Sequence, residues 1–219
     1  MPFLVTVITS CSGAPPKDRF GYRIYRTSIV DESSALFKNI PTLKKRVECY
    51  MASSGPGVRR IEIFKSRFIM NYYIDDTIIK TCPVSFGINP RGPKLSRDDG
   101  CTPEGTYTIT SCEPSEAFIF YLSLSYPNRE DADRALSSGL ISQKDHDRIF
   151  RALDAGKAPP QDTALGGDVG IHGQAVFVEH NGSYEFVNKT LGCPAVTNSD
   201  ITEMYRDFAV KGMTVIIHP

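Results

Sequence analysis

Alternating apolar and polar residues dominate the chain from residue 58 onward. A period of two is typical of half-buried β-strands, because successive side chains of a strand point to opposite faces. Asp75 and Asp76 separate two of these runs and predict a hairpin turn. The pattern therefore predicts strands that pack one face against a core. The expected core residues are Ile61, Ile63, Phe68, Met70, Tyr72, Ile74, Ile78 and Ile79.

A second hairpin is predicted around the dipeptide Asn181-Gly182. An apolar run at 175–178 precedes the dipeptide and another run at 184–187 follows it. Asn-Gly between two such runs is the strongest short-range signal for a two-residue hairpin turn. Because a hairpin carries the chain out and back, the residues just before it and just after it are expected to lie close together.

Helical patterns interrupt and follow these strands. Residues 129–158 predict a helical insertion, in which Ser142 caps a helix and His146 is exposed. The apolar positions expected in this insertion are Leu136, Leu140, Ile149, Phe150 and Leu153. A further helix is predicted at 198–208, and the chain ends in a strand after Gly212. The elements together predict a mainly β domain with a helical insertion.

Residues 1–57 are less regular and are expected to form a small N-terminal segment. Residues 33–50 predict helix on both sides of Pro41. The run Ser-Ser-Gly-Pro-Gly at 53–57 is typical of a linker. We therefore expect a domain boundary there, with an N-terminal segment at 1–57 and one larger domain at 58–219.

The first residues allow two interpretations. Phe3 to Ile8 is apolar, and the Ile-Thr-Ser-Cys run that ends at Cys11 is similar to the cleavage box of bacterial lipoproteins. In that interpretation Cys11 carries a lipid anchor. The apolar run is short for a signal peptide and has no positively charged leader before it. The alternative is an ordinary first strand that ends in a loop.

The overall composition excludes several classes of protein. With 41% hydrophobic and 23% charged residues, the 219-residue chain has an ordinary globular composition and can bury one substantial core. Its net charge is zero, which argues against a nucleic-acid partner. No apolar run reaches the length of about 18 residues that predicts a transmembrane helix. The spacing of His and Cys matches no zinc pattern, so no metal or other cofactor is expected.

One His and one Cys have neighbours that favour catalysis. His172 precedes Gly173, and Cys193 follows Gly192. A free thiol has a pKa of about 8.5 and is a weak nucleophile at neutral pH. A nearby imidazole can take its proton and leave a thiolate–imidazolium pair ready for acyl transfer. Gly192 permits a sharp turn, and backbone N–H groups there, including that of Cys193, would hold an oxyanion. The alternative is a buried structural Cys with an unrelated His.

The residues around this pair resemble the L,D-transpeptidase catalytic domain of the YkuD type. His172-Gly173 matches the first part of the family's pattern, and Thr190 with Gly192-Cys193 matches the second part. The resemblance implies that Cys193 is the nucleophile and His172 its base. The carbonyl of Gly173 would then orient the imidazole.

Other segments extend this resemblance over roughly residues 60–219. The Gly- and Pro-rich loop at 87–109 and the Ser-Tyr-Pro-Asn run at 125–128 look like the YafK-like branch of the family. In that branch Tyr126 and Asn128 would line the substrate cleft; the residues alone equally allow a packing aromatic and a helix cap. Leu191 stands where most members of the family have a second His. The YafK-like branch, which this chain resembles, does without that His.

The resemblance also implies a fold and an activity. The fold is mainly β, an L,D-transpeptidase-like β-sandwich or barrel with a helical insertion and a short N-terminal segment. The substrate is a peptidoglycan stem peptide, attacked at a diaminopimelate-type residue through a Cys193 thioester. The acyl group then passes to an amine, or to water with release of a peptidoglycan-linked lipoprotein. The substrate contacts that the resemblance implies are Thr190, Gly192, Tyr126 and Asn128.

The implied location is the periplasmic cell envelope, with membrane contact only through a lipid anchor at Cys11. An oxidising compartment permits disulfides. Two bridges can pair the remaining thiols in three ways, or all four can stay free; these are Cys49, Cys82, Cys101 and Cys112. The rival to the enzyme is a non-catalytic peptidoglycan-binding module of the same fold, which the missing second His favours. An unrelated cysteine peptidase is a third alternative.

Overall fold

The computed structural model of the chain describes residues 24–28, 32–33, 35, 39–175, 177–180 and 183–219. The strands are β1 (Ile24–Ser28), β2 (Arg59–Phe64), β3 (Ile69–Ile74), β4 (Thr77–Pro83), β5 (Gly105–Ser115), β6 (Ile119–Leu124), β7 (Gly170–His172), β8 (Phe177–His180), β9 (Ser183–Val187) and β10 (Thr214–His218). The helices are α1 (Leu43–Ser54), α2 (Arg129–Ser137), α3 (Gln143–Asp154), α4 (Asn198–Glu203) and the π-helical turn η2 (Met204–Phe208). The predicted mainly β fold with a helical insertion is confirmed.

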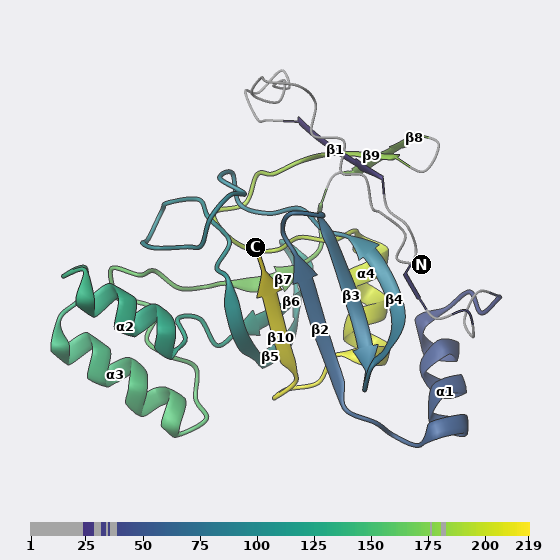
Figure 1. Ribbon diagram of the computed structural model, residues 1–219, viewed down its shortest axis with the longest axis horizontal. Coiled ribbons are helices and arrows are strands. Elements are labelled where there is room, and N and C mark those ends of the chain that lie inside the picture. The colour runs from purple at the N-terminus through teal and green to yellow at the C-terminus, as the bar shows by residue number, and fades with distance from the viewer. Residues whose placement is uncertain (1–23, 29–31, 34, 36–38, 176, 181–182) are drawn as a thin grey trace, which may run out of the picture.

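Seven strands form one mixed sheet in the order β4-β3-β2-β10-β5-β6-β7 (Figure 1). Only β2 and β10 run parallel; the other neighbours are antiparallel. The period-two pattern places Ile61 and Ile63 of β2 in the core, each with 0% exposure. Ile74 pairs with Thr77 across the turn predicted at Asp75 and Asp76, so that hairpin is confirmed.

One hydrophobic core joins this sheet to the helices α1, α4 and η2. Leu43 and Val47 of α1 belong to the same buried cluster as Tyr72 of β3 and Phe208 of η2. The predicted helix after Pro41 is therefore packed on the sheet. Most of the predicted core residues of β2 to β4 are buried, and the exceptions, Phe68 and Ile78, are half-buried.

The insertion forms a helical hairpin, α2 and α3, at one side of the sheet, away from α1 (Figure 1). A second, smaller hydrophobic cluster holds the two helices together; it contains Ala132, Ala135, Ile141, Ile149 and Leu165. Ser142 caps α3, as predicted, by accepting a hydrogen bond from the Asp145 N–H. The prediction that His146 is exposed is wrong, because its ring stacks on Phe150 and its Nε2 lies 2.7 Å from Asp133.

A small three-stranded sheet, in the order β1-β9-β8, lies next to the main sheet (Figure 1). Strands β8 and β9 are antiparallel, and His180 pairs with Ser183, which confirms the second predicted hairpin. Its turn, Asn181-Gly182, lies outside the described residues, as do residues 1–23 with the Cys11 box. In the part of the chain that the structure describes, no helix has the length and apolar character that crossing a bilayer requires.

The cysteines that the structure describes are all free thiols. Cys82 is buried; the others, Cys49, Cys101, Cys112 and Cys193, are half-buried. Of the alternatives left open by the sequence, the structure thus has the thiols of Cys49, Cys82, Cys101 and Cys112 unpaired.

Candidate active site

The segment after Cys193 connects the two edges of the main sheet. Ala195 exchanges two backbone hydrogen bonds of 2.8 Å with Ser85, which follows the edge strand β4. Two further backbone bonds, of 3.2 and 2.9 Å, connect the same segment to His172 of the opposite edge strand β7. This crossing closes the curled sheet at one end and places Cys193 close to His172, as the flanking hairpin predicted.

The imidazole of His172 is buried and oriented. It is only 4% exposed, and its Nδ1 lies 2.6 Å from the carbonyl oxygen of Gly173. The Phe118 ring packs 4.3 Å from it, and the Tyr121 ring is nearly parallel to it at 6.0 Å. A carbonyl can only accept, so Nδ1 is the donor and Nε2 is the basic nitrogen.

Burial also sets the charge of this imidazole. Burial lowers the pKa of His172, the Lys189 charge lowers it further, and the Gly173 carbonyl opposes both by raising it. The net pKa lies below the ordinary value of 6.5, so the ring is neutral at pH 7. A neutral ring with a free Nε2 is the form that accepts a proton.

Close packing leaves no room for a side chain at position 173. A Cβ at this position would lie 2.7 Å from the Phe118 oxygen and 2.9 Å from Asn198 Oδ1. The same Asn198 oxygen accepts the Gln174 N–H at 2.7 Å. The turn after β7 is therefore fixed on both sides, which holds the carbonyl of Gly173 against the imidazole.

The thiol of Cys193 is held by oxygen atoms. Its Sγ lies 3.3 Å from the Asp168 carbonyl oxygen and 3.6 Å from the Tyr121 hydroxyl, which also donates to the Asp168 oxygen. Burial raises the pKa of Cys193, and this outweighs the Gly170 backbone N–H and the Tyr121 hydroxyl, which lower it. The resting thiol is therefore protonated.

The pKa shifts of Cys193 and His172 correct one expectation from the sequence, the preformed thiolate–imidazolium pair. A preformed thiolate–imidazolium pair requires a low thiol pKa and a high imidazole pKa. The structure has both shifts in the opposite direction, because burial disfavours charge on Cys193 and on His172 alike. The resting pair is neutral, and the proton has to move during the attack.

Thr190 and Gly192 shape the loop that presents the thiol. The Thr190 hydroxyl donates to the Cys193 carbonyl oxygen at 2.7 Å and accepts the Gly192 N–H at 3.3 Å. Gly192 has φ +142°, and a Cβ there would lie 2.7 Å from the Cys101 oxygen. The Thr190 hydroxyl is thus engaged within the loop. The Cys193 N–H has no hydrogen-bond acceptor among the described residues and remains a free donor.

The substrate contacts implied for Tyr126 and Asn128 are not what the structure shows. Tyr126 is fully buried, and its hydroxyl donates to the Leu165 oxygen at 3.0 Å. Asn128 caps α2: its Oδ1 accepts the Asp131 N–H, and its Nδ2 donates to the Thr106 oxygen. Tyr126 is therefore a core residue and Asn128 a helix cap, because filling the core and satisfying a helix terminus occupy these side chains.

Three residues near Cys193 are not predicted as site residues from the sequence. Tyr121 lies beside His172 because β6 pairs with β7, and Asp168 follows a loop that returns there. Lys94 is 3% exposed, pairs with Asp99 at 2.9 Å and lowers the pKa of Cys193. In the sequence Tyr121 is one aromatic among several in a strand, so only strand pairing distinguishes it.

Comparisons with known proteins identify the family of the chain. The family model described as the YkuD L,D-transpeptidase catalytic domain matches residues 58–217. No curated protein matches the chain. Three similar solved structures differ widely from this chain in sequence. The L,D-transpeptidase of Xylanimonas cellulosilytica is 11% identical, over 74% of this chain and 61% of that protein, with a TM-score of 0.42.

The helical cell shape determining protein Pgp2 of Campylobacter jejuni is 20% identical, over 73% of this chain and 47% of that protein, with a TM-score of 0.45. An L,D-transpeptidase of Mycobacterium smegmatis is 14% identical, over 74% of this chain and 58% of that protein, with a TM-score of 0.43. The chain thus spans about half to three fifths of the length of these proteins. The family model covers well over half of the chain and contains the whole site, so the chain belongs to the L,D-transpeptidase catalytic domain family.

Proposed function

We propose that the chain is a cysteine acyl-transfer enzyme that acts on peptidoglycan stem peptides. The observation that carries this proposal is the crossing at Ala195, which seats Cys193 next to His172 at the closed end of the sheet. Membership of the family supports the substrate class. Leu191, in place of the family's second His, leaves this machinery intact because His172 alone supplies a base.

The first half-reaction starts from the neutral pair. Because Gly173 holds Nδ1 of His172, Nε2 accepts the proton of Cys193 Sγ while Sγ attacks the carbonyl carbon of a diaminopimelate-type residue. The carbonyl oxygen becomes an oxyanion, and the free Cys193 N–H is a donor for it. The Tyr121 hydroxyl donates its one proton to the Asp168 oxygen in the resting site and lies 3.6 Å from Sγ; by turning that O–H to the sulfur it would stabilise negative charge there as the proton leaves.

The intermediate then collapses, and the C–N bond of the substrate breaks. The proton on Nε2 of His172 goes to the departing amine, and the acyl group stays on Cys193 as a thioester. In the second half-reaction an amine or a water attacks this thioester and gives a proton to His172. Sγ leaves and recovers its proton from the imidazole, so all bonds and protons balance.

The acceptor decides the outcome. An amine forms a new peptide bond, which is L,D-transpeptidation, whereas water forms a carboxylate, which is hydrolysis. Hydrolysis releases a protein when the departing amine belongs to a peptidoglycan-linked lipoprotein. This substrate places the protein in the periplasmic envelope, with Cys11 as the residue that a lipid anchor would modify.

Mass spectrometry of muropeptides tests the proposal. Purified muropeptides, including lipoprotein-linked ones, are incubated with the protein, with Cys193→Ala and with Cys82→Ala as the matched loss of a different thiol. We expect new products with the protein and with Cys82→Ala, and none with Cys193→Ala. Transfer replaces the departing amine of the donor by the acceptor amine, and hydrolysis replaces it by water, so the mass of the acyl product separates the two outcomes. Unchanged muropeptides in every reaction would favour the non-catalytic binding module instead.

A further inference from the structure

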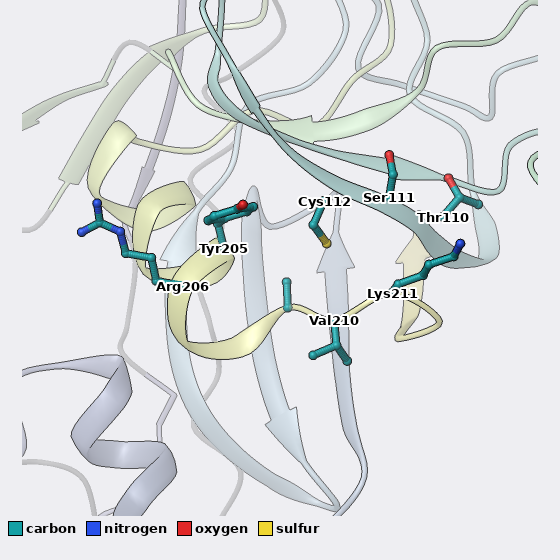
Figure 2. Close-up of a pocket in the computed structure, with 8 residues that line it drawn as sticks. Thr110, Ser111, Cys112, Tyr205, Arg206, Val210 and Lys211 are labelled. Atoms are coloured by element: carbon teal, nitrogen blue, oxygen red, sulfur yellow. The ribbon is translucent and has the colours of Figure 1, made fainter.

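A second groove lies beside β5, under the π-helical turn η2 and the residues that follow it (Figure 2). It has a volume of about 600 Å³. Its lining residues are Thr110, Ser111, Cys112, Tyr205, Arg206, Ala209, Val210 and Lys211. None of the residues of the catalytic pair takes part in it.

Neighbouring residues of β6 separate this groove from the active site. Tyr121 contacts Cys193, whereas Phe120 stacks on Tyr205 of the groove, with ring centroids 4.0 Å apart and planes at 14°. Successive side chains of a strand point to opposite faces. The groove and the thiol therefore lie on opposite faces of β6.

The backbone on both sides of the groove is irregular. The pairing of β5 with β6 shifts register between Ile109 and Ser111, which isolates Thr110. Across from it, the helix that begins at Asn198 widens into the π-helical turn η2. Bulges and π-turns each interrupt regular packing and recur at functional sites. Here the two irregularities meet at the same groove.

The residues that line the groove carry positive charge, although Glu113, next to Cys112 in β5, adds to burial in raising the pKa of the Cys112 thiol. No lining residue is acidic, and Arg206 and Lys211 are exposed, without an ion pair to any described residue. Three arginines of the insertion differ, because Arg129, Arg134 and Arg148 each pair with an aspartate. Figure 2 shows Arg206 and Lys211 far apart, with the Arg206 side chain on the outer side of the helix, directed away from Cys112 and Lys211. Two separated free cations favour a ligand that carries more than one negative charge.

Between the two cations the groove offers the groups that bind a sugar. The ring of Tyr205 is half-buried and is fixed by its stacking on Phe120, which provides an apolar platform for the C–H face of a pyranose. The hydroxyls of Thr110 and Ser111 border it; Thr110 already donates to the Ser123 carbonyl oxygen at 3.3 Å, and Ser111 is hydrogen-bonded to the Ser123 hydroxyl at 3.0 Å, so each oxygen offers a sugar hydroxyl an acceptor only. The thiol of Cys112 lines the middle of the groove.

We propose that this groove is a second, non-catalytic binding site for an anionic glycopeptide strand of the cell wall. Arg206 and Lys211 would bind carboxylates of successive stem peptides, and Tyr205 would contact the glycan between them. The proposal rests on the proposed function for the identity of the polymer. Its consequence is that the groove holds the strand while Cys193 acts on one of its stems.

Co-sedimentation with purified sacculi tests the binding. The variant Arg206→Glu/Lys211→Glu is compared with Lys144→Glu/Lys157→Glu, which makes the same charge change at exposed lysines in and after α3. Both carry Cys193→Ala to prevent turnover. We expect about tenfold weaker binding for the groove variant alone, which corresponds to about 1.4 kcal/mol. Equal binding of the two variants overturns the proposal.

Cys112 provides an independent readout, because its thiol lines the groove. Soluble glycan strands with stem peptides should slow maleimide labelling of Cys112, and leave Cys49 on α1 unaffected, in peptide mass maps. Inorganic phosphate at the same charge concentration should protect less. Equal protection by phosphate, or none by the strands, overturns the proposal and reduces the groove to a general anion site or to no site.

Turnover separates this proposal from the proposed function. With both correct, the groove variant processes small muropeptides at the normal rate and intact sacculi more slowly than the control variant. Turnover of sacculi that is equal in the two variants defeats the groove alone. No turnover by any protein, with weaker sacculus binding by the groove variant, defeats the proposed function and leaves the groove.

Discussion

Two thiols of this chain have similar immediate neighbours and different chemical settings. Cys82 of β4 donates to the Tyr72 hydroxyl at 3.6 Å, and Cys193 lies 3.6 Å from the Tyr121 hydroxyl. Burial is the largest influence on both, and it raises the pKa of each thiol above its ordinary value. A tyrosine contact and a shifted pKa therefore do not distinguish a nucleophile from a structural thiol.

The nearby lysines do not distinguish the thiols either. Lys80 lowers the pKa of Cys82 and Lys94 lowers that of Cys193, and in both cases burial outweighs the lysine. Each lysine is already paired with a carboxylate, Lys80 with Asp200 and Lys94 with Asp99. The remaining differences are access and a base. Cys82 is 2% exposed within a strand, whereas Cys193 lies on a loop beside His172.

The largest expected effect is that of removing each sulfur in turn. Cys193→Ala should abolish turnover of muropeptides and leave the free energy of unfolding nearly unchanged. Cys82→Ala should keep turnover and lose about 1–3 kcal/mol of stability, because it leaves a cavity in the core. Product formation and urea unfolding measure the two effects. Inactivity of a folded Cys82→Ala protein would contradict the assignment of Cys82 as structural.

Removing the base should make the Cys193 site resemble that of Cys82. His172→Asn takes away Nε2, and we expect kcat/KM to fall by about 10²–10⁴-fold, the range for a general base. The matched control is His218→Asn, because His218 pairs with Glu62 and stacks on Phe64 away from the site. Steady-state kinetics on muropeptides measure both variants. A loss of similar size in His218→Asn would show that fold, rather than proton transfer, is being measured.

The next largest effect is the difference in kcat between the variants of Tyr121 and Tyr72, the tyrosines beside the two thiols. Tyr121→Phe removes a donor that stabilises charge on Cys193, and such a bond contributes about 1.5–3 kcal/mol. We expect a fall in kcat of about 10–100-fold with an unchanged fold. Tyr72→Phe removes the equivalent hydroxyl at Cys82 and should leave kcat unchanged. Equal kcat for Tyr121→Phe and the parent protein would remove Tyr121 from the mechanism.

The elements that the sequence pattern predicts well are local. The alternation after residue 58 indicates the strands β2 to β4, and the Asn181-Gly182 signal gives the hairpin that returns the chain from His172 to Cys193. Both follow from side-chain periodicity and turn chemistry, which act over a few residues. The catalytic pair is visible for the same reason, because its glycines lie next to it in the sequence.

What the sequence could not give depends on tertiary packing. Tyr121 belongs to the site only because β6 pairs with β7, and the crossing at Ala195 needs both edges of the sheet. Tyr126 is as aromatic as Tyr121 but fills the core. The neutral state of the catalytic pair is a consequence of burial, which no local motif encodes.

A smaller effect is expected in how turnover and the chemical labelling of Cys193 depend on pH. With the pKa of His172 below 6.5, its base form is present at pH 6.5 and above, so kcat/KM should be level from there up to about pH 9. Iodoacetamide labelling of resting Cys193 needs the thiolate and should still rise above pH 9, because burial raises that pKa. Labelling that levels off below pH 8 would show a preformed ion pair. The rates are measured at a series of pH values by peptide mass mapping, which separates Cys193 from Cys82, Cys101 and Cys112, the other thiols whose pKa is raised by burial.

The smallest effect is the pH dependence of the free energy of unfolding. It has opposite directions for His172 and for the two thiols. The thiols have raised pKa values, so their contribution is complete below pH 9.0, the ordinary thiol value, and is lost as the pH rises through their folded values. His172 has a lowered pKa, so its contribution is complete above 6.5 and is lost as the pH falls through its folded value. Urea unfolding at a series of pH values should therefore show a loss just below pH 6.5 that His172→Asn abolishes, and an alkaline loss that Cys82→Ala reduces. Aspartates with a lowered pKa, such as Asp75 and Asp99, lose their contribution only below their ordinary value of 3.8. Since only the Cys193 site contains an imidazole, Cys82→Ala should leave the acid loss unchanged. An acid loss that persists in His172→Asn would assign it to other groups and remove this distinction between the two thiols.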